Sequence, residues 1–237
     1  MDLAKVFRRF CENLHRRQEL MTEDNVRYYW FASMLHEDAD VEHYTMEYPY
    51  DSSVFEASQR RAKKELDFLY LNGDESYCME IKFHRNPDPA STYAHTDAAG
   101  SLFNDILRLS LFVPGKSFAT QKNVCTLPQN TRRLFLYVTD AEMDAYLAKG
   151  NGTAVNSGYR EELRKFYACP KDAGFYAPKF EEVPATFSQV ALDALNKEKH
   201  SLQALPKICL LHADSYCKMQ SESFEDRQCH VRLYEIQ

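Results

Sequence analysis

Apolar residues recur at helical spacing at the start of the chain. Five of them predict an amphipathic first helix with a basic outer face. They are Val6, Phe7, Phe10, Cys11 and Leu14. Thr22 is the expected N-cap of a second helix over about residues 23–37. Glu23 falls in the first turn of that helix, where the helix dipole favours a negative charge.

The centre of the chain predicts a β-hairpin. Residues 66–71 and 77–84 are rich in β-forming residues, and Asn72-Gly73 lies between the two runs. Asn-Gly between such runs is the strongest short-range signal for a hairpin. We therefore expect two adjacent antiparallel strands here.

Three charged residues of this hairpin are expected to share one face of the sheet. Side chains alternate along a strand, so Glu80 and Lys82 point the same way. If the loop comprises Asn72-Gly73 alone, Asp67 lies opposite Cys78, which has the same parity; if it comprises residues 72–75, Asp67 lies opposite Glu80. Two neighbouring carboxylates repel unless a cation lies between them. The pattern therefore indicates a site for a cation, held by hard oxygen ligands that suit Mg²⁺.

The elements around the hairpin alternate between strand and helix. Residues 41–50 read as a strand that Pro49 ends or confines to a sheet edge. A helix is expected from about residue 96 to before Pro114, then a long polar connection over residues 115–130. Residues 134–138 predict a buried strand and residues 141–149 a short helix. The resulting order is helix, three strands, helix and strand.

The last third of the chain is less regular. Helical spacing is present at residues 159–167 and 187–197, and residues 207–211 and 229–236 read as strands that are candidates for a hairpin extending the sheet. The length of 237 residues suggests a single domain over residues 1–237, with residues 141–237 as a C-terminal elaboration.

Composition narrows the class of protein. With 44% hydrophobic and 27% charged residues, the chain is typical of a soluble globular protein. It has no apolar run long enough for a membrane helix and no signal-peptide core, and its seven cysteines are scattered. We therefore expect a cytoplasmic protein with reduced thiols and no membrane partner. The net charge of −6 argues mildly against coating nucleic acid, although residues 60–64 form a local basic cluster.

Asp67 and the Glu80-Ile81-Lys82 triplet resemble the motif of the PD-(D/E)XK nuclease superfamily. The motif consists of an acidic residue on one strand and then Glu or Asp, any residue and Lys on the next. Leu66 stands where the motif name has Pro, a departure that many members show. The resemblance covers about residues 22–140 and implies a restriction-endonuclease-like α/β core. This core has the order α-β-β-β-α-β and a mixed central sheet flanked by helices.

The resemblance also implies an activity. Asp67 and Glu80 would hold Mg²⁺, with Mn²⁺ as a substitute, and Lys82 would help to orient or deprotonate a water and offset charge in the transition state. A further acid is often supplied by the helix before the first strand; Glu23 is the candidate and Glu37 the alternative. The implied function is a metal-dependent nuclease, with DNA favoured over RNA as the substrate and RNA left open. The sequence leaves open its specificity and whether it acts as a homodimer.

Other hypotheses remain alongside the nuclease. One is a non-catalytic nuclease-fold subunit that binds or scaffolds a nucleic-acid-processing or defence complex, and another is a metal-dependent hydrolase of a small substrate. Arg108 is weighed as a phosphate contact and Cys78 with His84 as a nucleophile pair, the latter with no positioning argument. Four residues have the chemistry for a zinc site but not a common spacing. They are His212, Cys217, Cys229 and His230.

Overall fold

The computed structural model describes most of the chain. The described residues are 1–16, 22–50, 64–73, 75–85, 95–119, 124–149, 164, 165, 167, 206–218 and 227–237. The helices are α1 (Leu3–Arg16), α2 (Glu23–Leu35), α3 (His95–Ser110) and α4 (Ala141–Lys149), with a 3₁₀ turn η1 (Val41–His43). The strands are β1 (Tyr44–Tyr50), β2 (Lys64–Asn72), β3 (Glu75–His84), β4 (Ser117–Ala119), β5 (Val124–Thr126), β6 (Thr131–Asp140), β7 (Ile208–Lys218) and β8 (Arg227–Ile236).

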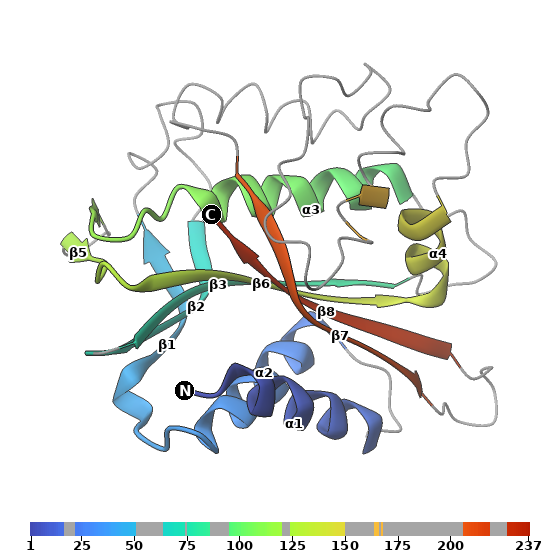
Figure 1. The fold of residues 1–237 in the computed structure, drawn as a ribbon, viewed down its shortest axis with the longest axis horizontal. Helices are drawn as coiled ribbons and strands as arrows, with labels where there is room; N and C mark the ends of the chain where they lie inside the picture. The colour runs from blue at the N-terminus through green and yellow to red at the C-terminus, as the bar shows by residue number, and fades with distance from the viewer. Residues whose placement is uncertain are drawn as a thin grey trace.

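A mixed six-stranded sheet forms the centre of the molecule, and helices flank it on both sides (Figure 1). The strand order is β1-β2-β3-β6-β8-β7. β3 and β6 are parallel, because α3 carries the chain across one face of the sheet between them. The other neighbours in this sheet are antiparallel. The predicted order of helix, three strands, helix and strand is present as α2, β1, β2, β3, α3 and β6.

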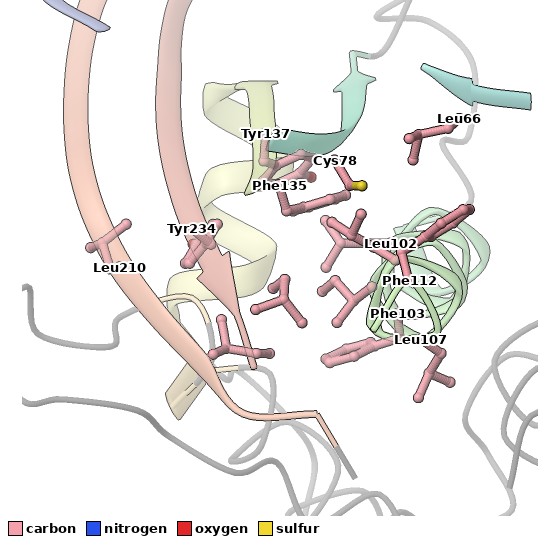
Figure 2. Close-up of a cluster of buried hydrophobic side chains, with 14 of the residues drawn as sticks. Leu66, Cys78, Leu102, Phe103, Leu107, Phe112, Phe135, Tyr137, Leu210 and Tyr234 are labelled. Atoms are coloured by element: carbon pink, nitrogen blue, oxygen red, sulfur yellow. The ribbon is translucent and has the colours of Figure 1, made fainter. Parts of the chain in front are cut away.

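Two apolar cores lie on the two faces of the sheet. The α3-side core contains side chains of α3 with those of the sheet, among them Leu102, Phe135 and Tyr234 (Figure 2). The opposite core packs α1 and α2 against the other face. There Trp30 is fully buried, lies 5.4 Å from the ring of Phe10, and donates from Nε1 to Met79 Sδ at 3.2 Å. Apolar surface buried on both faces stabilises the three-layer arrangement.

Several sequence predictions are confirmed and others needed correction. The five apolar residues of the first helix are all buried in α1, and Thr22 caps α2 in a capping box with Asn25. The C-terminal strands pair as a hairpin and extend the sheet through β8. Pro49 lies in β1, which is an edge strand. The predicted helix over 187–197 and most of that over 159–167 lie outside the described residues.

Two corrections concern short elements. Residues 41–43 form the 3₁₀ turn η1 rather than strand, because the Asp40 carboxylate accepts from the backbone N–H of Glu42 at 3.0 Å and caps the turn. The connection over residues 115–130 is not wholly irregular, because β4 pairs with β5. Phe118 of β4 anchors this small sheet, with its ring 5.0 Å from that of Phe112 in the α3-side core.

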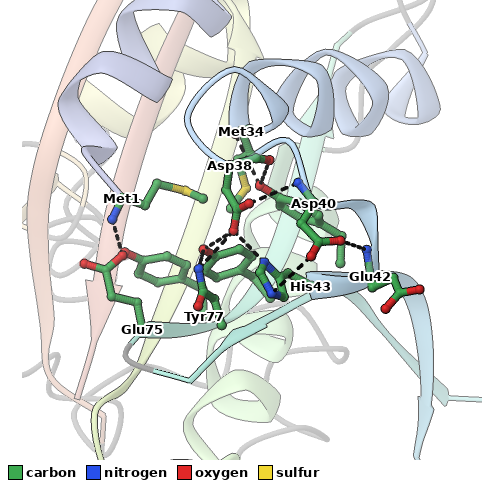
Figure 3. Close-up of polar contacts among 11 residues, drawn as sticks. Met1, Met34, Asp38, Asp40, Glu42, His43, Glu75 and Tyr77 are labelled. Carbon is green, nitrogen blue, oxygen red and sulfur yellow. Dashed lines mark hydrogen bonds and ion pairs between the residues drawn. The ribbon is translucent and has the colours of Figure 1, made fainter.

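The β2–β3 hairpin has the register predicted for a loop over residues 72–75. Asn72 is paired with Glu75 and Phe68 with Met79, which aligns Asp67 with Glu80. Asp38 follows the C-terminal end of α2 and links that end to this hairpin (Figure 3). Its carboxylate accepts from the Tyr70 hydroxyl at 2.8 Å and from the Asn72 amide at 3.0 Å. Burial works against ionisation of Asp38, but these hydrogen bonds outweigh it and lower its pKa to about 2.

In both β1 and β2, side chains two residues apart point to opposite faces of the sheet at the level of Asp67. Met46 and Phe68 pack in the α1/α2-side core, whereas Tyr48 and Leu66, two residues further along each strand, pack in the α3-side core. Strict alternation would keep residues two apart on one face. The exchange coincides with Glu47, whose φ of 52° lies in the left-handed region. The backbone distortion at Glu47 therefore turns the strand pair at the residue that the sequence singles out.

Replacing Trp30 with Ala should lower the free energy of unfolding by about 3–5 kcal/mol, because a large fully buried side chain is lost from the core. Urea denaturation followed by circular dichroism measures this change. Tyr28→Ala on the same helix is the control, because Tyr28 is 61% exposed and its loss should change stability by less than about 0.5 kcal/mol. Equal costs at the two positions would contradict the assigned packing of α2.

Replacing Glu47 with Gly should give a more stable protein than replacing it with Ala, by about 1 kcal/mol, because only Gly adopts a positive φ without steric cost. Both variants remove the carboxylate, so the difference between their free energies of unfolding reports the cost of the backbone conformation at this position. Equal stabilities of the two variants would show that Glu47 does not hold a left-handed conformation.

Candidate functional site

The candidate site lies where β2 and β3 diverge. Before Phe68, β2 continues to pair with β1 but no longer with β3, while β3 beyond Met79 continues to pair with β6. This divergence leaves backbone N–H groups on the β2-facing edge of β3 without a strand partner. Carboxylates accept hydrogen bonds from these N–H groups in place of a neighbouring strand. Ile81 N donates to Asp67 Oδ2 at 2.7 Å, and Phe83 N donates to Glu23 Oε2 at 3.2 Å.

α3 lines the other side of the site with three polar residues. Ser101, Asp105 and Arg108 follow i, i+4, i+7 spacing, which places them on one helix face. Four residues of a helix rise about 6 Å, and two residues of a strand rise about 6.6 Å. Successive residues on this face of α3 can therefore lie opposite alternate residues of β3, which runs in the opposite direction.

The contacts between α3 and β3 follow this alignment. The Ser101 hydroxyl lies 3.2 Å from His84 Nε2. Asp105 Oδ2 lies 3.3 Å from Lys82 Nζ, and Arg108 Nη2 lies 3.3 Å from Glu80 Oε2. Arg108 also contacts Asp105 Oδ1 at 3.0 Å, which links two of the three pairs. A polar stripe thus crosses an otherwise apolar interface.

Arg27 joins the remaining carboxylates from the α2 side. Its Nη2 lies 2.7 Å from Asp67 Oδ1 and 2.9 Å from Glu23 Oε1. Its Nη1 lies 3.2 Å from Asp24 Oδ1 and 3.7 Å from Glu47 Oε1. One guanidinium therefore contacts four carboxylates that come from α2, β1 and β2.

Burial dominates the electrostatics of the two central carboxylates. It raises the pKa of Glu80 well above its ordinary value, and Asp67 and Asp105 raise this pKa further while Arg108 lowers it. Burial also raises the pKa of Asp67, although Arg27 and the Ile81 N–H oppose the shift. Among the described residues no group donates a hydrogen bond to Glu80 Oε1, which is fully shielded from solvent. This corner of the site is suited to a proton or a cation.

Glu23 and Lys82 lie at the more open side. Burial raises the pKa of Glu23 against the lowering effects of Lys82 and the Phe83 N–H. For Lys82, burial lowers the pKa, but Asp105 and Glu23 outweigh it and the net shift is upward. Lys82 is therefore an ammonium at neutral pH and acts as a hydrogen-bond donor.

The structure brings together the four residues that the sequence singled out. Asp67 and Glu80 follow the last paired residues of β2 and β3, and their carboxylates act on each other. The charges of Glu23 and Lys82 also act on each other. The alternative acid Glu37 is exposed and follows the C-terminal end of α2, about 20 Å along the helix from Glu23. It does not belong to this site.

The predicted orientation of Asp67 was wrong in one respect. Glu80 and Lys82 point towards α3, as their contacts show, whereas Asp67 contacts Arg27 of α2 on the other side. Because the strand pair turns at Glu47 and Asp67, the Asp67 carboxylate reaches the β3 backbone at Ile81 instead. The carboxylates still meet, through a distortion that strict alternation does not predict.

Sequence reasoning did not assign Arg27 and Asp105 to the site. The relevant signals were the i, i+4 spacing of Glu23 and Arg27, and the i, i+4, i+7 spacing on α3. Arg108 had been weighed as a phosphate contact, and the structure places it against Glu80 and Asp105. The basic cluster at residues 60–64 lies outside the described residues except for the Lys64 backbone.

Among the described residues, neither of the two other candidate constellations is assembled. Cys78 and His84 lie six residues apart on β3, about 20 Å, and burial raises the pKa of the Cys78 thiol. The His212 ring is tilted against that of Phe7, with 5.2 Å between the ring centroids, and Cys229 is buried in the α1/α2-side core. The Cys217 side chain lies outside the described residues. Within the described part of the chain, no group of three or more His, Cys, Asp or Glu side chains is arranged to hold a metal.

Comparisons with known proteins identify no relative. No family model, no curated protein and no solved structure matches this chain. Among the described helices, none has both the length and the apolar character needed to cross a bilayer.

His84→Gln should reduce the pH dependence of stability. Burial, helped by the charge of Lys82, lowers the pKa of His84 to about 3, against about 6.5 in an unfolded chain. Between these values the unfolded state binds more protons than the folded state, so His84 makes the protein less stable as pH falls. The stability advantage of wild type over His84→Gln should therefore shrink by about 2 kcal/mol from pH 7.0 to pH 4.5.

Urea denaturation at the two pH values measures this difference. The exposed His36→Gln variant is the control for general acid effects. An advantage that is the same at both pH values would mean that His84 is not held neutral by its surroundings.

Proposed function

We propose that the protein is a metal-dependent nuclease that hydrolyses phosphodiester bonds of nucleic acid, DNA rather than RNA. The observation that carries the proposal is the interaction of the Asp67 and Glu80 carboxylates where β2 and β3 diverge, with Lys82 two residues further along β3. Two carboxylates, an ammonium and a third acid at Glu23 provide the groups that the PD-(D/E)XK motif implies.

The fold supports the same proposal. Among the described residues, the elements from α2 to β6 follow the α-β-β-β-α-β order of a restriction-endonuclease-like core, with η1 and the small β4–β5 sheet as additions. β1, β2, β3 and β6 are consecutive neighbours, and the Asp67 and Glu80-Ile81-Lys82 positions lie on the two central strands of the four. We propose this core as the fold family of the chain.

The donor set suits a hard divalent cation. Mg²⁺ is commonly bound through one or two carboxylates, with water and substrate phosphate oxygens completing its coordination. Asp67 and Glu80 would hold it, and the Glu80 oxygen that accepts no hydrogen bond from a described residue is a natural ligand atom. Once bound, the ion would polarise the scissile phosphate and lower the pKa of a water.

The chain's own residues have separate roles in this proposal. Lys82, held by Asp105 at 3.3 Å, donates hydrogen bonds and offsets negative charge developing on the phosphate. Glu23 accepts from the Phe83 N–H and fixes the edge of β3, which sets the direction of the neighbouring Lys82. Arg108 orients Glu80 from the α3 side.

One observation favours a rival function. Both proposed metal ligands are already paired with arginines, Asp67 with Arg27 and Glu80 with Arg108. A non-catalytic nuclease-fold subunit could keep these pairs permanently as structural contacts. Such a protein would show no thermal shift with Mg²⁺ or Mn²⁺ and would not cleave nucleic acid.

Lys82→Ala should abolish cleavage of supercoiled plasmid and of single-stranded DNA in the presence of Mg²⁺ or Mn²⁺. Loss of one positioned cation at a developing negative charge lowers rates by a factor of about 100 or more. Gel assays at matched protein concentration, with and without EDTA, measure the rate. Circular dichroism should show that the variant remains folded.

The matched control is Lys116→Ala, because Lys116 is exposed and lies in the turn before β4. It should cleave at the wild-type rate. Cleavage by Lys82→Ala at that rate would remove the mechanism, and absence of both cleavage and a metal-induced thermal shift in wild type would favour the non-catalytic subunit.

A further inference from the structure

The four carboxylates around Arg27 divide into an inner and an outer pair. The inner pair, Glu23 and Asp67, contacts Nη2 and belongs to the candidate site. The outer pair, Asp24 and Glu47, contacts Nη1, and its side chains are 70% and 59% exposed. The Arg27 side chain itself is only 17% exposed. Arg27 thus spans the distance between the inner carboxylates and the protein surface.

A small pocket adjoins the outer pair. It has a volume of about 140 Å³ and is lined by Asp24, Arg27, Tyr28, Met46 and Glu47. The lining includes Arg27 and both outer carboxylates but neither Glu23 nor Asp67, so the open space adjoins the outer pair. A shift of Arg27 outward would therefore meet solvent and two acceptors, whereas a shift inward would meet the packed sheet.

We propose that Arg27 is a built-in cation that a divalent metal displaces from Asp67, and that the displaced guanidinium, retained by Asp24 and Glu47, contacts a phosphate of the nucleic acid. This inference rests on the proposed function and assigns to Arg27 a role as a substrate-positioning residue.

Competition follows from the atoms of Asp67. Its Oδ2 accepts from the Ile81 N–H at 2.7 Å, and its Oδ1 faces Arg27 at 2.7 Å. A divalent ion held by Asp67 would place a second positive charge on the carboxylate that Arg27 already contacts, and the two like charges would repel. The ion and Arg27 therefore compete for the same carboxylate. In the ion-free protein, Arg27 compensates a carboxylate that is otherwise buried at a cost.

The outer pair determines where Arg27 goes. Asp24 and Glu47 already contact Nη1, so the guanidinium can leave Asp67 without losing all of its partners. In the outward position it lies between the metal ligands and the pocket. Its planar fork of donors is suited to two oxygens of a phosphate, a recognition that a lysine does not reproduce. Metal binding would then prepare the site for the substrate.

The first test compares Mn²⁺ affinity, measured by isothermal titration calorimetry without nucleic acid, for wild type and Arg27→Met. Removing the competing charge should tighten Mn²⁺ binding by about fivefold or more. In the Lys82→Ala background with Mn²⁺ present, Arg27→Met should weaken binding of a labelled DNA oligonucleotide by about fivefold, through loss of one phosphate contact.

Arg132→Met is the matched control. Arg132 forms an arginine–carboxylate pair with Glu235, with Nε 2.8 Å from Oε1, on β6 and β8. Its loss also removes one positive charge and one ion pair, but it should leave Mn²⁺ and DNA affinities unchanged. Tighter Mn²⁺ binding by Arg27→Met supports the proposal only if Arg132→Met binds Mn²⁺ with wild-type affinity. An equal gain in Mn²⁺ affinity in both variants would overturn the proposal.

A second test uses the outer carboxylates. Introduced together into wild type, Asp24→Asn and Glu47→Gln should weaken Mn²⁺ binding, because the displaced guanidinium loses its acceptors. In the Arg27→Met background the same pair of substitutions should have much less effect, which gives a double-mutant coupling. A simple loss of negative charge near the ion would weaken binding equally in both backgrounds, and that outcome would overturn the proposal.

Unchanged or weaker Mn²⁺ binding by a folded Arg27→Met protein would also overturn the proposal. If Arg27→Met does not fold, Arg27→Lys is tested instead. An ammonium cannot bridge all four carboxylates, so Arg27→Lys should still tighten Mn²⁺ binding. Unchanged Mn²⁺ affinity of Arg27→Lys would overturn the proposal. Metal-dependent cleavage with no effect of Arg27 would remove this inference alone. No Mn²⁺ binding by either protein would remove the proposed function as well.

Discussion

The divergence of β2 from β3 is the constraint on which the rest of the site depends. A β-strand edge that loses its partner inside a protein must satisfy its backbone N–H groups, and each one left unpaired costs about 1–3 kcal/mol. Here the Asp67 and Glu23 carboxylates accept from the N–H groups of Ile81 and Phe83. The same contacts that complete the sheet therefore gather acidic groups beside Glu80 and Lys82.

Gathering carboxylates in this way requires cations from both neighbouring layers. α2 supplies Arg27, α3 supplies Arg108, and β3 itself supplies Lys82. Buried ion pairs of this kind contribute little net stability, because desolvation offsets most of their attraction. Metal binding to Asp67 and Glu80, with the arginines as exchangeable counter-ions, is the function that we propose.

The order of the elements could be predicted from the sequence, because it rests on strong local signals. The amphipathic spacing of α1, the Thr22 cap and the Asn72-Gly73 turn each specify local structure. The site was predictable as far as it follows from strand parity, as for Glu80 and Lys82. The left-handed backbone at Glu47 has no signal in the residue type, and β4 and β5 are too short to show a period. Arg27 reaches Asp67 only because α2 packs across the sheet, which is a tertiary property.

The most direct measurement is a crystal structure of the protein grown with Mn²⁺, with data collected at an energy that gives anomalous signal from manganese. We expect an anomalous peak bonded to one oxygen each of Asp67 and Glu80, with Arg27 no longer in contact with Asp67. A map without such a peak, in which Asp67 remains paired with Arg27 and Glu80 with Arg108, would show that no metal binds here. The charged cluster would then be a structural feature of a protein that does not use a metal here.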